Sequence, residues 1–289
     1  MKCNMLSDQL EPYHQWLCEN EKSQNTIKKY KQYLSDFFVF LENKEVCKIQ
    51  VLAWKNFLKK KLAPASVNNV LAALNSFFRF IDRKDLMVHY VRIRKQVFCP
   101  AEKELKREEY ERLIRTAMET KNERLALILQ TICSTGIRIS ELTFITVEAV
   151  EKGKAEVECK GRIRTVFLTR KLCEVLQKYR KKKNILTGPI FITRSGKPVD
   201  RSNIWREMKA LGDRANVHKE KIFPHNLRHL FARIYYSQQK DLSRLADILG
   251  HSNINTTKVY TMESGETHLK QIEEMNLVFS EYNGIYLML

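Results

Sequence analysis

The chain has 289 residues, 44% of them hydrophobic, and this length allows two ordinary domains or one large one with a sizeable core. The formal net charge is +18, and residues 1–100 hold 17 Lys and Arg against 9 Asp and Glu, so the basic excess is not confined to a tail. A basic excess along the whole chain favours a long polyanionic partner such as nucleic acid over an ordinary basic protein.

The seven cysteines argue against two kinds of site. Their number is odd and no CxxC pair occurs, so the sequence predicts neither a disulfide framework nor a cysteine zinc site. The first residues show no signal-peptide pattern, and no apolar run approaches the ~20 residues of a membrane-spanning helix. We therefore expect a cytoplasmic protein that does not act in a membrane.

Residues 7–90 carry the apolar spacing of a small all-α domain. Apolar residues recur in steps of three and four over 26–41 and over 66–81, and a shorter helix fits about 51–61. Ser66 is the expected N-cap of the helix over 66–81. We therefore expect three helices with polar and basic outer faces.

The outer faces of these helices offer candidate contacts to DNA. Asparagine can bind an adenine edge in the major groove, although a plain solvated surface is the competing interpretation for any one residue. The candidates are Lys28, Lys29, Asn68, Asn69 and Arg79. Residues 91–104 are basic and show little periodicity, so we expect a linker that lets two domains close around a duplex.

Residues 105–289 are predicted to be mainly helical with a small antiparallel β-sheet. Strands at about 155–159 and 165–168 flank the turn signal Lys160-Gly161, and a third strand fits 189–192. Gly136 is expected to end a helix, and Pro224 to begin one. The expected helices lie over 106–120, 123–134, 170–182, 201–214, 225–237, 242–249 and 266–279.

Two residue patterns suggest different chemistries. His225 and His229 have a spacing that can bind zinc, but Asn226 stands where the metalloprotease pattern requires Glu, and no third ligand is evident. We therefore expect neither a metal ion nor another cofactor. Arg138 and Arg228 suit a phosphate because a guanidinium is always charged and binds oxygens bidentately, although each alone is typical of a surface ion pair.

The joint pattern resembles the tyrosine recombinase (phage integrase) family, in an Xer-like form without an arm-binding domain. TGIRISEL resembles the motif of the first catalytic arginine, HNLRH the His-x-x-Arg motif, and LGHSNINTTKVYT the segment with the second histidine and the tyrosine. ECKGRIRTVFL resembles the β-hairpin lysine segment. NTIKKYKQYLSDFFVFLE and APASVNNVLAALNSFFRFI resemble the core-DNA-binding domain. The resemblance extends from about residue 7 to about residue 280, and it implies a two-domain architecture.

The resemblance implies a role for each matching residue. Tyr260 would attack the scissile phosphate, form a 3′-phosphotyrosyl link and release a 5′-hydroxyl. Arg138 and Arg228 would hold the non-bridging oxygens, and Lys160 would protonate the leaving oxygen. His225 would assist proton transfer at the tyrosine, because imidazole titrates near neutral pH.

Four further residues follow from the same motifs. His251 would orient the phosphate, and Glu141 would support the basic cluster. Arg162 and Arg164 share the hairpin of Lys160, compete with it for the role of general acid, and are expected to contact DNA. Arg164→Ala is therefore expected to cleave ordinary DNA well.

The implied function is site-specific DNA recombination, with double-stranded DNA as partner and four protomers on two duplexes. We expect integration or excision of a mobile element; the alternatives are Xer-type chromosome dimer resolution, type IB topoisomerase-like relaxation and a non-catalytic DNA-binding regulator. An accessory DNA-bending or directionality protein is a further expected partner. The apolar run at 285–289 is expected to be shielded from water, and folding back on its own core is one interpretation. The resemblance implies instead that the segment after Tyr260 contacts a neighbouring protomer.

Overall fold

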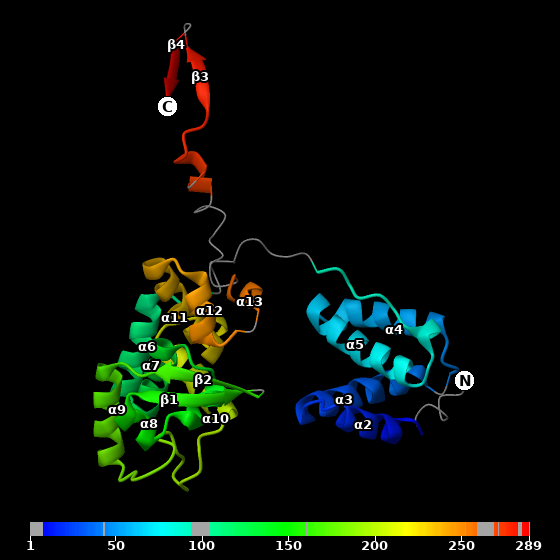
Figure 1. Ribbon diagram of the computed structural model, residues 1–289, viewed down its shortest axis with the longest axis horizontal. Helices are drawn as coiled ribbons and strands as arrows, with labels where there is room; N and C mark the ends of the chain where they lie inside the picture. Colours follow the sequence, from blue (N-terminus) through cyan, green and yellow to red (C-terminus); the bar gives the residue numbers. More distant parts are fainter. Residues whose placement is uncertain are drawn as a thin grey trace. The chain divides into compact units, whose positions relative to one another are not determined.

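The computed structural model describes residues 8–42, 44–93, 104–159, 161–251, 253–258, 269–270, 272–282 and 285–288. For residues 159 and 162, and for those from 279 onward, the description covers the backbone alone. The chain divides into two compact units, residues 1–95 and 96–289, which are treated separately below (Figure 1). Residues 94–103, most of the predicted linker, lie outside the described residues.

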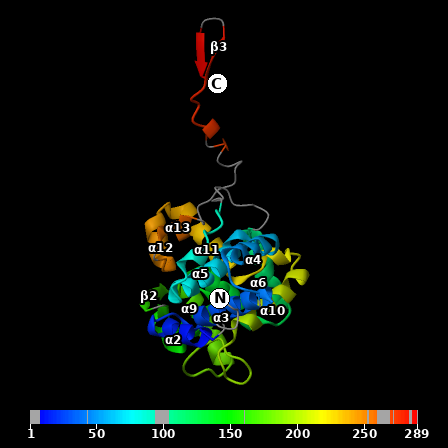
Figure 2. The same cartoon turned by 90° about the vertical axis from the view of Figure 1, so that its right-hand side faces the viewer.

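In its described residues, 8–42 and 44–93, the first unit is a bundle of α-helices (Figure 2). Ser23 caps α3 by accepting a hydrogen bond from the backbone N–H of Thr26, as expected of a serine at this position. The prediction that Ser66 caps α5 is wrong, because Pro64 occupies the first turn and Ala63 is the N-cap. The elements are α2 (Leu10–Glu19), which was not predicted, α3 (Gln24–Leu41), α4 (Lys48–Lys61), α5 (Pro64–Phe80) and the 3-10 helix η1 (Lys84–Leu86).

Asparagine side chains on α5 hold the segment that leads out of this unit. Asn75 is buried, donates to the carbonyl of Val88 at 2.8 Å and accepts from its N–H at 3.0 Å. Asn68, two turns earlier, makes the same pair of bonds to Val91, at 2.9 and 2.7 Å. Each amide therefore satisfies the backbone N–H and C=O of one residue in this segment, as a neighbouring β-strand would. The side chain of Asn68 has a structural role, which argues against the base contact expected from the sequence.

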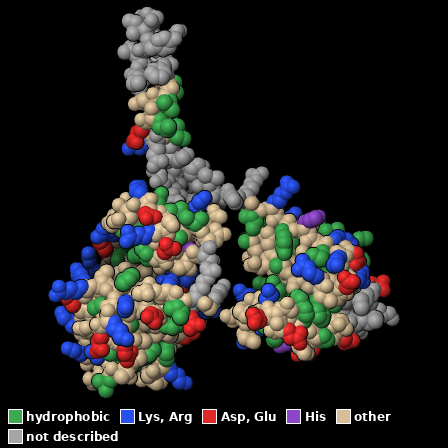
Figure 3. All heavy atoms as spheres, in the orientation of Figure 1, with side chains coloured by type: hydrophobic (Ala, Val, Ile, Leu, Met, Phe, Trp, Pro, Cys, Tyr) green, Lys and Arg blue, Asp and Glu red, His purple; other side chains and the backbone are tan. Residues whose placement is uncertain are grey.

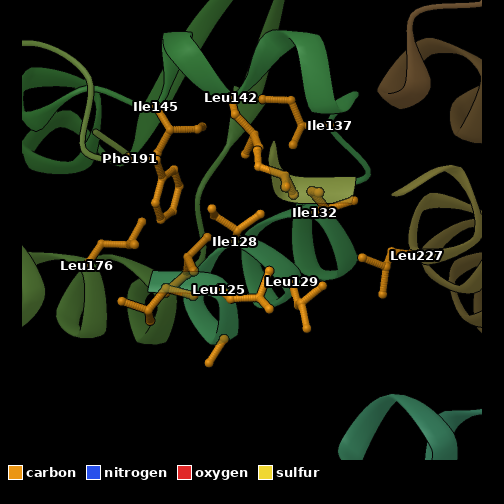
Figure 4. Close-up of a cluster of buried hydrophobic side chains, with 14 of the residues drawn as sticks. Leu125, Ile128, Leu129, Ile132, Ile137, Leu142, Ile145, Leu176, Phe191 and Leu227 are labelled. Atoms are coloured by element: carbon orange, nitrogen blue, oxygen red, sulfur yellow. The ribbon is translucent and has the colours of Figure 1, made fainter. Parts of the chain in front are cut away.

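In the second unit, helix α7 (Glu123–Thr135) is buried on most of its faces. In α7, the apolar residues Leu125, Ile128, Leu129 and Ile132 are each 1% exposed or less, and Figure 4 shows them among side chains from other elements, such as Leu176 and Phe191 (Figure 4). As expected, α7 ends at Gly136, which adopts φ +65. The core therefore fixes the backbone next to Arg138.

The hairpin and most of the longer helices of this unit lie where the sequence predicted them, whereas the short helices α8 and α13 were not predicted. Strands β1 and β2 pair antiparallel, with Val157 opposite Arg164. The elements are α6 (Arg107–Glu119), α7 (Glu123–Thr135), η3 (Ile139–Phe144), α8 (Val147–Lys152), β1 (Lys154–Cys159), β2 (Arg162–Phe167), α9 (Arg170–Lys182), α10 (Arg201–Arg214), η4 (Lys219–Lys221), α11 (Pro224–Gln239), α12 (Leu242–Leu249), α13 (Ile254–Lys258), β3 (Phe279–Tyr282) and β4 (Ile285–Met288).

Two secondary-structure predictions in this unit are wrong. The strand expected at 189–192 is reduced to isolated bridges, Thr146 to Pro189 and Ile192 to Pro198, since proline has no N–H to continue a ladder. The helix expected over 266–279 does not reach its predicted end. Its first three residues and residue 271 lie outside the described part, 269–270 and 272–273 are helical, and Asn276 has φ +47.

The chain then forms a hairpin in which β3 pairs with β4, Phe279 opposite Met288. The terminal apolar run is therefore a β-strand, which suits its aromatic and β-branched residues. Among the helices in the described ranges, none is both long enough and apolar enough to cross a membrane.

Candidate active site

Residues from three places in the sequence meet at one end of the second unit. Arg138 lies at the N-cap of η3, Arg228 lies one turn into α11, and His251 follows α12. Arg228 Nη2 lies 2.9 Å from His251 Nε2, and Arg138 Nη2 lies 3.5 Å from the carbonyl oxygen of Gly250. The structure therefore brings together the two arginines and the second histidine that the sequence motifs single out.

Arg228 is buried, with 1% of its surface exposed. Its Nη1 donates to the carbonyl of Gly136 at 2.5 Å, and its Nη2 donates to the carbonyl of Leu249 at 2.6 Å. Backbone groups from two segments therefore set the orientation of the guanidinium before any ligand binds. A cation held in this way is preorganised for an anion, since a buried charge requires compensation.

Glycine allows this arrangement at residue 136. A Cβ atom there would lie 2.6 Å from Cδ1 of Phe231 and 2.9 Å from a methyl carbon of Leu249. Gly136 also has φ +65, a conformation that other residues adopt at a cost. The glycine in the first arginine motif therefore lets α11 and α12 approach the end of α7.

Glu141 holds Arg138 through two contacts. Its Oε1 accepts from Arg138 Nη1 at 2.9 Å, and its Oε2 accepts from the Arg138 backbone N–H at 2.8 Å. Glu141 is 2% exposed, whereas the side chain of Arg138 remains one-third exposed. The carboxylate thus anchors the guanidinium from the protein side and leaves part of it open to a ligand.

His251 links the arginine pair to α13. An arginine can only donate, so His251 Nε2 accepts from Arg228, and the proton is on Nδ1, which donates to Oγ1 of Thr257 at 2.9 Å. Burial and then the positive charges of Arg228 and Arg138 lower the pKa of His251 to about 4. The ring is therefore neutral at pH 7, and it joins Arg228 to α13, the helix that precedes Tyr260 in the sequence.

His225 and His229 pack edge to face, with ring centroids 4.5 Å apart. Desolvation, followed by Arg228 and Arg138, lowers the pKa of the His225 imidazole, although that side chain is exposed. Burial and then His225 lower the pKa of His229 to about 4. Within the described ranges, no three His, Cys, Asp or Glu side chains form a group that could hold a metal ion.

Two residues of the expected site, Lys160 and Tyr260, lie outside the described residues, and so does the side chain of Arg162. The backbone next to them is described. Gly161 forms the hairpin turn with φ +71, and α13 ends at Lys258.

The expected DNA contacts divide into two groups. Lys28, Lys29, Asn69 and Arg79 are exposed on the first unit, as a DNA-contacting role requires. Arg164, by contrast, directs its Nη2 to Glu141 Oε2 at 2.6 Å, and its side chain is 14% exposed. The expectations that Arg164 contacts DNA and that its loss leaves cleavage of ordinary DNA intact are therefore both at odds with its internal ion pair.

Comparison with known proteins identifies the family. The phage integrase family matches residues 103–266, and the phage integrase N-terminal SAM-like domain matches residues 10–85. The chain belongs to the phage integrase family. It is therefore a tyrosine recombinase by family, as its motifs imply.

Relatives of this integrase family extend over nearly the whole chain. The chain is 29% identical to the tyrosine recombinase XerA of Pyrococcus furiosus, over 96% of this chain and 97% of that protein. It is 27% identical to the tyrosine recombinase XerD of Oceanobacillus iheyensis, over 89% and 94% respectively. A lambda integrase(75-356) dimer bound to a COC′ core site shares the fold with a TM-score of 0.74, at 17% identity and covering 92% of this chain and 97% of that one.

The integrase fold of this chain also contains features that the sequence motifs did not reveal. A cavity of about 600 Å³ adjoins His225, and its walls include Trp205, Arg201, Arg206 and Phe223. Trp205 is half exposed, and the motif RSNIWRE at the start of α10 could have drawn attention to it. Thr257 was also missed as a site residue, because its fully buried hydroxyl meets His251 only in the folded chain.

Proposed function

We propose that this protein is a site-specific DNA recombinase in which Tyr260 attacks a phosphodiester, forms a 3′-phosphotyrosyl link and releases a 5′-hydroxyl. The observation that carries the proposal is the convergence of Arg138, Arg228 and His251 at one place, next to the segment that ends two residues before Tyr260. Because the covalent link conserves the energy of the broken bond, a second 5′-hydroxyl can reverse the step without ATP.

Arg138 and Arg228 hold the non-bridging oxygens of the scissile phosphate. The transition state of phosphoryl transfer spreads negative charge over these oxygens, and fixed positive donors stabilise it. Arg228 is oriented by two carbonyls, and Arg138 by Glu141, so each guanidinium needs little reorganisation. His251, neutral and hydrogen-bonded to Arg228, keeps that guanidinium in place.

Proton transfer is assigned to two other residues. Lys160, which stands between the residues of β1 and β2 in the sequence, protonates the leaving 5′-oxygen. His225 accepts the proton of the Tyr260 phenol, whose ordinary pKa of ~10 is well above neutral pH. The lowered pKa of His225 supports this role, because the ring must be neutral to accept a proton.

Double-stranded DNA is the proposed partner. The net charge of +18 belongs to both halves of the chain, and Figure 3 shows Lys and Arg side chains on the visible face of each unit, with acidic side chains between them (Figure 3). We assign core DNA binding to residues 7–90, a basic linker to 91–104 and catalysis to 105–289. Exposed Lys28, Lys29, Asn69 and Arg79, together with Arg162, supply contacts to the duplex.

The cellular role that we propose is the integration or excision of a mobile element, in the cytoplasm, by four protomers on two paired sites. The C-terminal segment provides a contact between protomers, and an accessory DNA-bending protein sets direction. The match with XerA over nearly its full length supports chromosome dimer resolution as the second candidate. Inverted repeats of the kind found at the ends of mobile elements, if present in the DNA beside the gene, would favour integration or excision.

Strand exchange between two duplexes tests the proposal. A binding site is first selected by the protein from a random-sequence duplex library, and two labelled duplexes of different length then carry that site. Recombinant products of the two mixed lengths are expected from the wild type. Relaxation of supercoiled plasmid without exchange would indicate a topoisomerase-like enzyme, and binding without either reaction would indicate a regulator.

A further inference from the structure

Arg164 lies on β2 beneath the arginine pair rather than on the surface. Its neighbours on the strand, Ile163 and Thr165, are exposed, so alternation directs Arg164 inward. Its side chain is 14% exposed. An arginine at such a place, on the hairpin that carries Lys160, needs internal acceptors for its charge.

The guanidinium of Arg164 joins two elements of the site. Its Nη2 donates to Glu141 Oε2 at 2.6 Å, and its Nη1 donates to the carbonyl of Ile248 at 3.2 Å. Glu141 is the residue that holds Arg138, and Ile248 lies in α12, just before His251. Arg164 therefore connects the hairpin to the carboxylate that holds Arg138 and to the backbone that leads to His251.

Gly250 provides a second, independent indication of the same contact. A Cβ atom at this position would lie 2.4 Å from Cδ and 2.6 Å from Nε of Arg164. The glycine between α12 and His251 thus provides the space that the Arg164 side chain occupies. The aliphatic part of Arg164 and its guanidinium therefore both contact the surrounding protein.

We propose that Arg164 is a positioning residue that, through Glu141, sets the guanidinium of Arg138 for the scissile phosphate. The inference rests on the proposed function of Arg138 as a phosphate clamp. Glu141 lies between two guanidiniums, and the bond from Arg164 fixes the plane of its carboxylate. Without that bond Glu141 keeps only its contacts to Arg138, so its carboxylate can rotate away from its present plane and the guanidinium of Arg138 shifts relative to the phosphate.

The test compares Arg164→Met, which keeps an unbranched apolar side chain but loses the charge, with Arg164→Lys, which keeps the charge. Arg170→Met is the matched control, because that side chain is 95% exposed and pairs only with Glu174 among the contacts described. Single-turnover cleavage is measured on the selected duplex and on the same duplex with a methylphosphonate at the scissile position. That substrate lacks one charged oxygen, so it depends less on the arginine clamp.

We expect Arg164→Met to bind DNA within twofold of wild type and to cleave ordinary DNA about 100-fold more slowly, as small misplacements of a catalytic group do. The methylphosphonate should reduce that deficit at least tenfold, as it should for Arg138→Ala, and Arg164→Lys should restore part of the rate. Cleavage by Arg164→Met within threefold of wild type, or an equal deficit on both substrates, would overturn the inference.

A structural measurement separates this inference from the proposed function. In crystals of Arg164→Met, the bond between Arg138 Nη1 and Glu141 Oε1 should be broken or shifted, and in Arg164→Lys it should persist. If the wild type forms no covalent adduct while Arg138 moves in this way, the proposed function fails and the positioning role stands. An unmoved Arg138 in Arg164→Met would refute the positioning role whatever the wild-type activity.

Discussion

His251 donates a hydrogen bond from Nδ1 to Oγ1 of Thr257, over 2.9 Å. The other ring nitrogen accepts from Arg228, so one imidazole connects the buried arginine to α13. Thr257 is fully buried and lies three residues before Tyr260 in the sequence. Under the proposed mechanism, this contact couples the arginine that holds the phosphate to the segment that precedes the nucleophile.

Thr257→Val should therefore slow cleavage at least tenfold, whereas Thr257→Ser should stay near wild type. Valine keeps the shape but leaves the Nδ1–H of His251 without its acceptor, which costs about 1–3 kcal/mol when the group is buried. Single-turnover cleavage and thermal unfolding of both variants check this prediction. Equal cleavage rates for valine and serine would show that the hydroxyl plays no part in the site.

Stability should fall as the pH drops from about 6.5 to about 4. In the unfolded chain His229 and His251 take up protons near 6.5, whereas burial lowers the pKa of each to about 4 in the folded protein. The unfolded state then binds more protons over this interval, so the free energy of unfolding decreases with decreasing pH. Urea unfolding at several pH values measures the slope.

Variants identify the groups responsible for this slope. His229→Gln and His251→Gln together should flatten the dependence between pH 6.5 and 4. A slope that persists undiminished in the double variant would assign it to other groups.

Gly136→Ala should destabilise the protein more than Gly153→Ala. Both glycines have left-handed backbones, φ +65 and +68, so the strain of about 1–2 kcal/mol is common to both substitutions. A Cβ at 136 meets Phe231 and Leu249, whereas at 153 nothing lies within 4 Å. Overpacking should add about 1–3 kcal/mol at residue 136, and denaturant unfolding of the two variants gives the difference. Equal losses would mean that the core absorbs the added methyl without strain.

Lys160→Ala should cleave ordinary DNA poorly and DNA with a 5′-bridging phosphorothiolate well, because a sulfur leaving group needs no general acid. Arg162→Ala serves as the comparison on the same hairpin and should cleave ordinary DNA well. Cleavage is measured as the release of the strand that carries the new 5′-hydroxyl or 5′-thiol. Normal cleavage of ordinary DNA by Lys160→Ala would place the general acid elsewhere.

The sequence predicted local structure better than side-chain partners. Helices such as α10 and α12 are predictable because their apolar spacing is a local signal. In the structure each is capped by an aspartate directly before it, Asp200 and Asp241. Arg164 could not be assigned in this way, because its acceptors lie 23 and 84 residues away in the sequence. The DNA contact expected of Arg164 rested on its positive charge, and that charge serves a DNA contact and an internal ion pair equally well.

Asn68 illustrates the same limit in the first unit. Its place on an outer helical face was correctly inferred, but the segment that returns to cover it begins only after η1, and Val91 lies 23 residues further along. At the C-terminus, apolar residues in steps of three and four suggested a helix up to Phe279. The helix instead ends after residue 273, Asn276 adopts φ +47 and a strand begins at Phe279, and no local pattern marks the change.

The covalent adduct tests the central claim most directly. The wild-type protein is incubated with a selected duplex that carries a nick near the cleavage position, so that the released strand diffuses away and the adduct accumulates. Peptide mass spectrometry should locate the nucleotide on Tyr260, and Tyr260→Phe should bind the duplex normally and form no adduct. An adduct on another residue, or one that persists in Tyr260→Phe, would contradict the assignment of Tyr260 as the nucleophile.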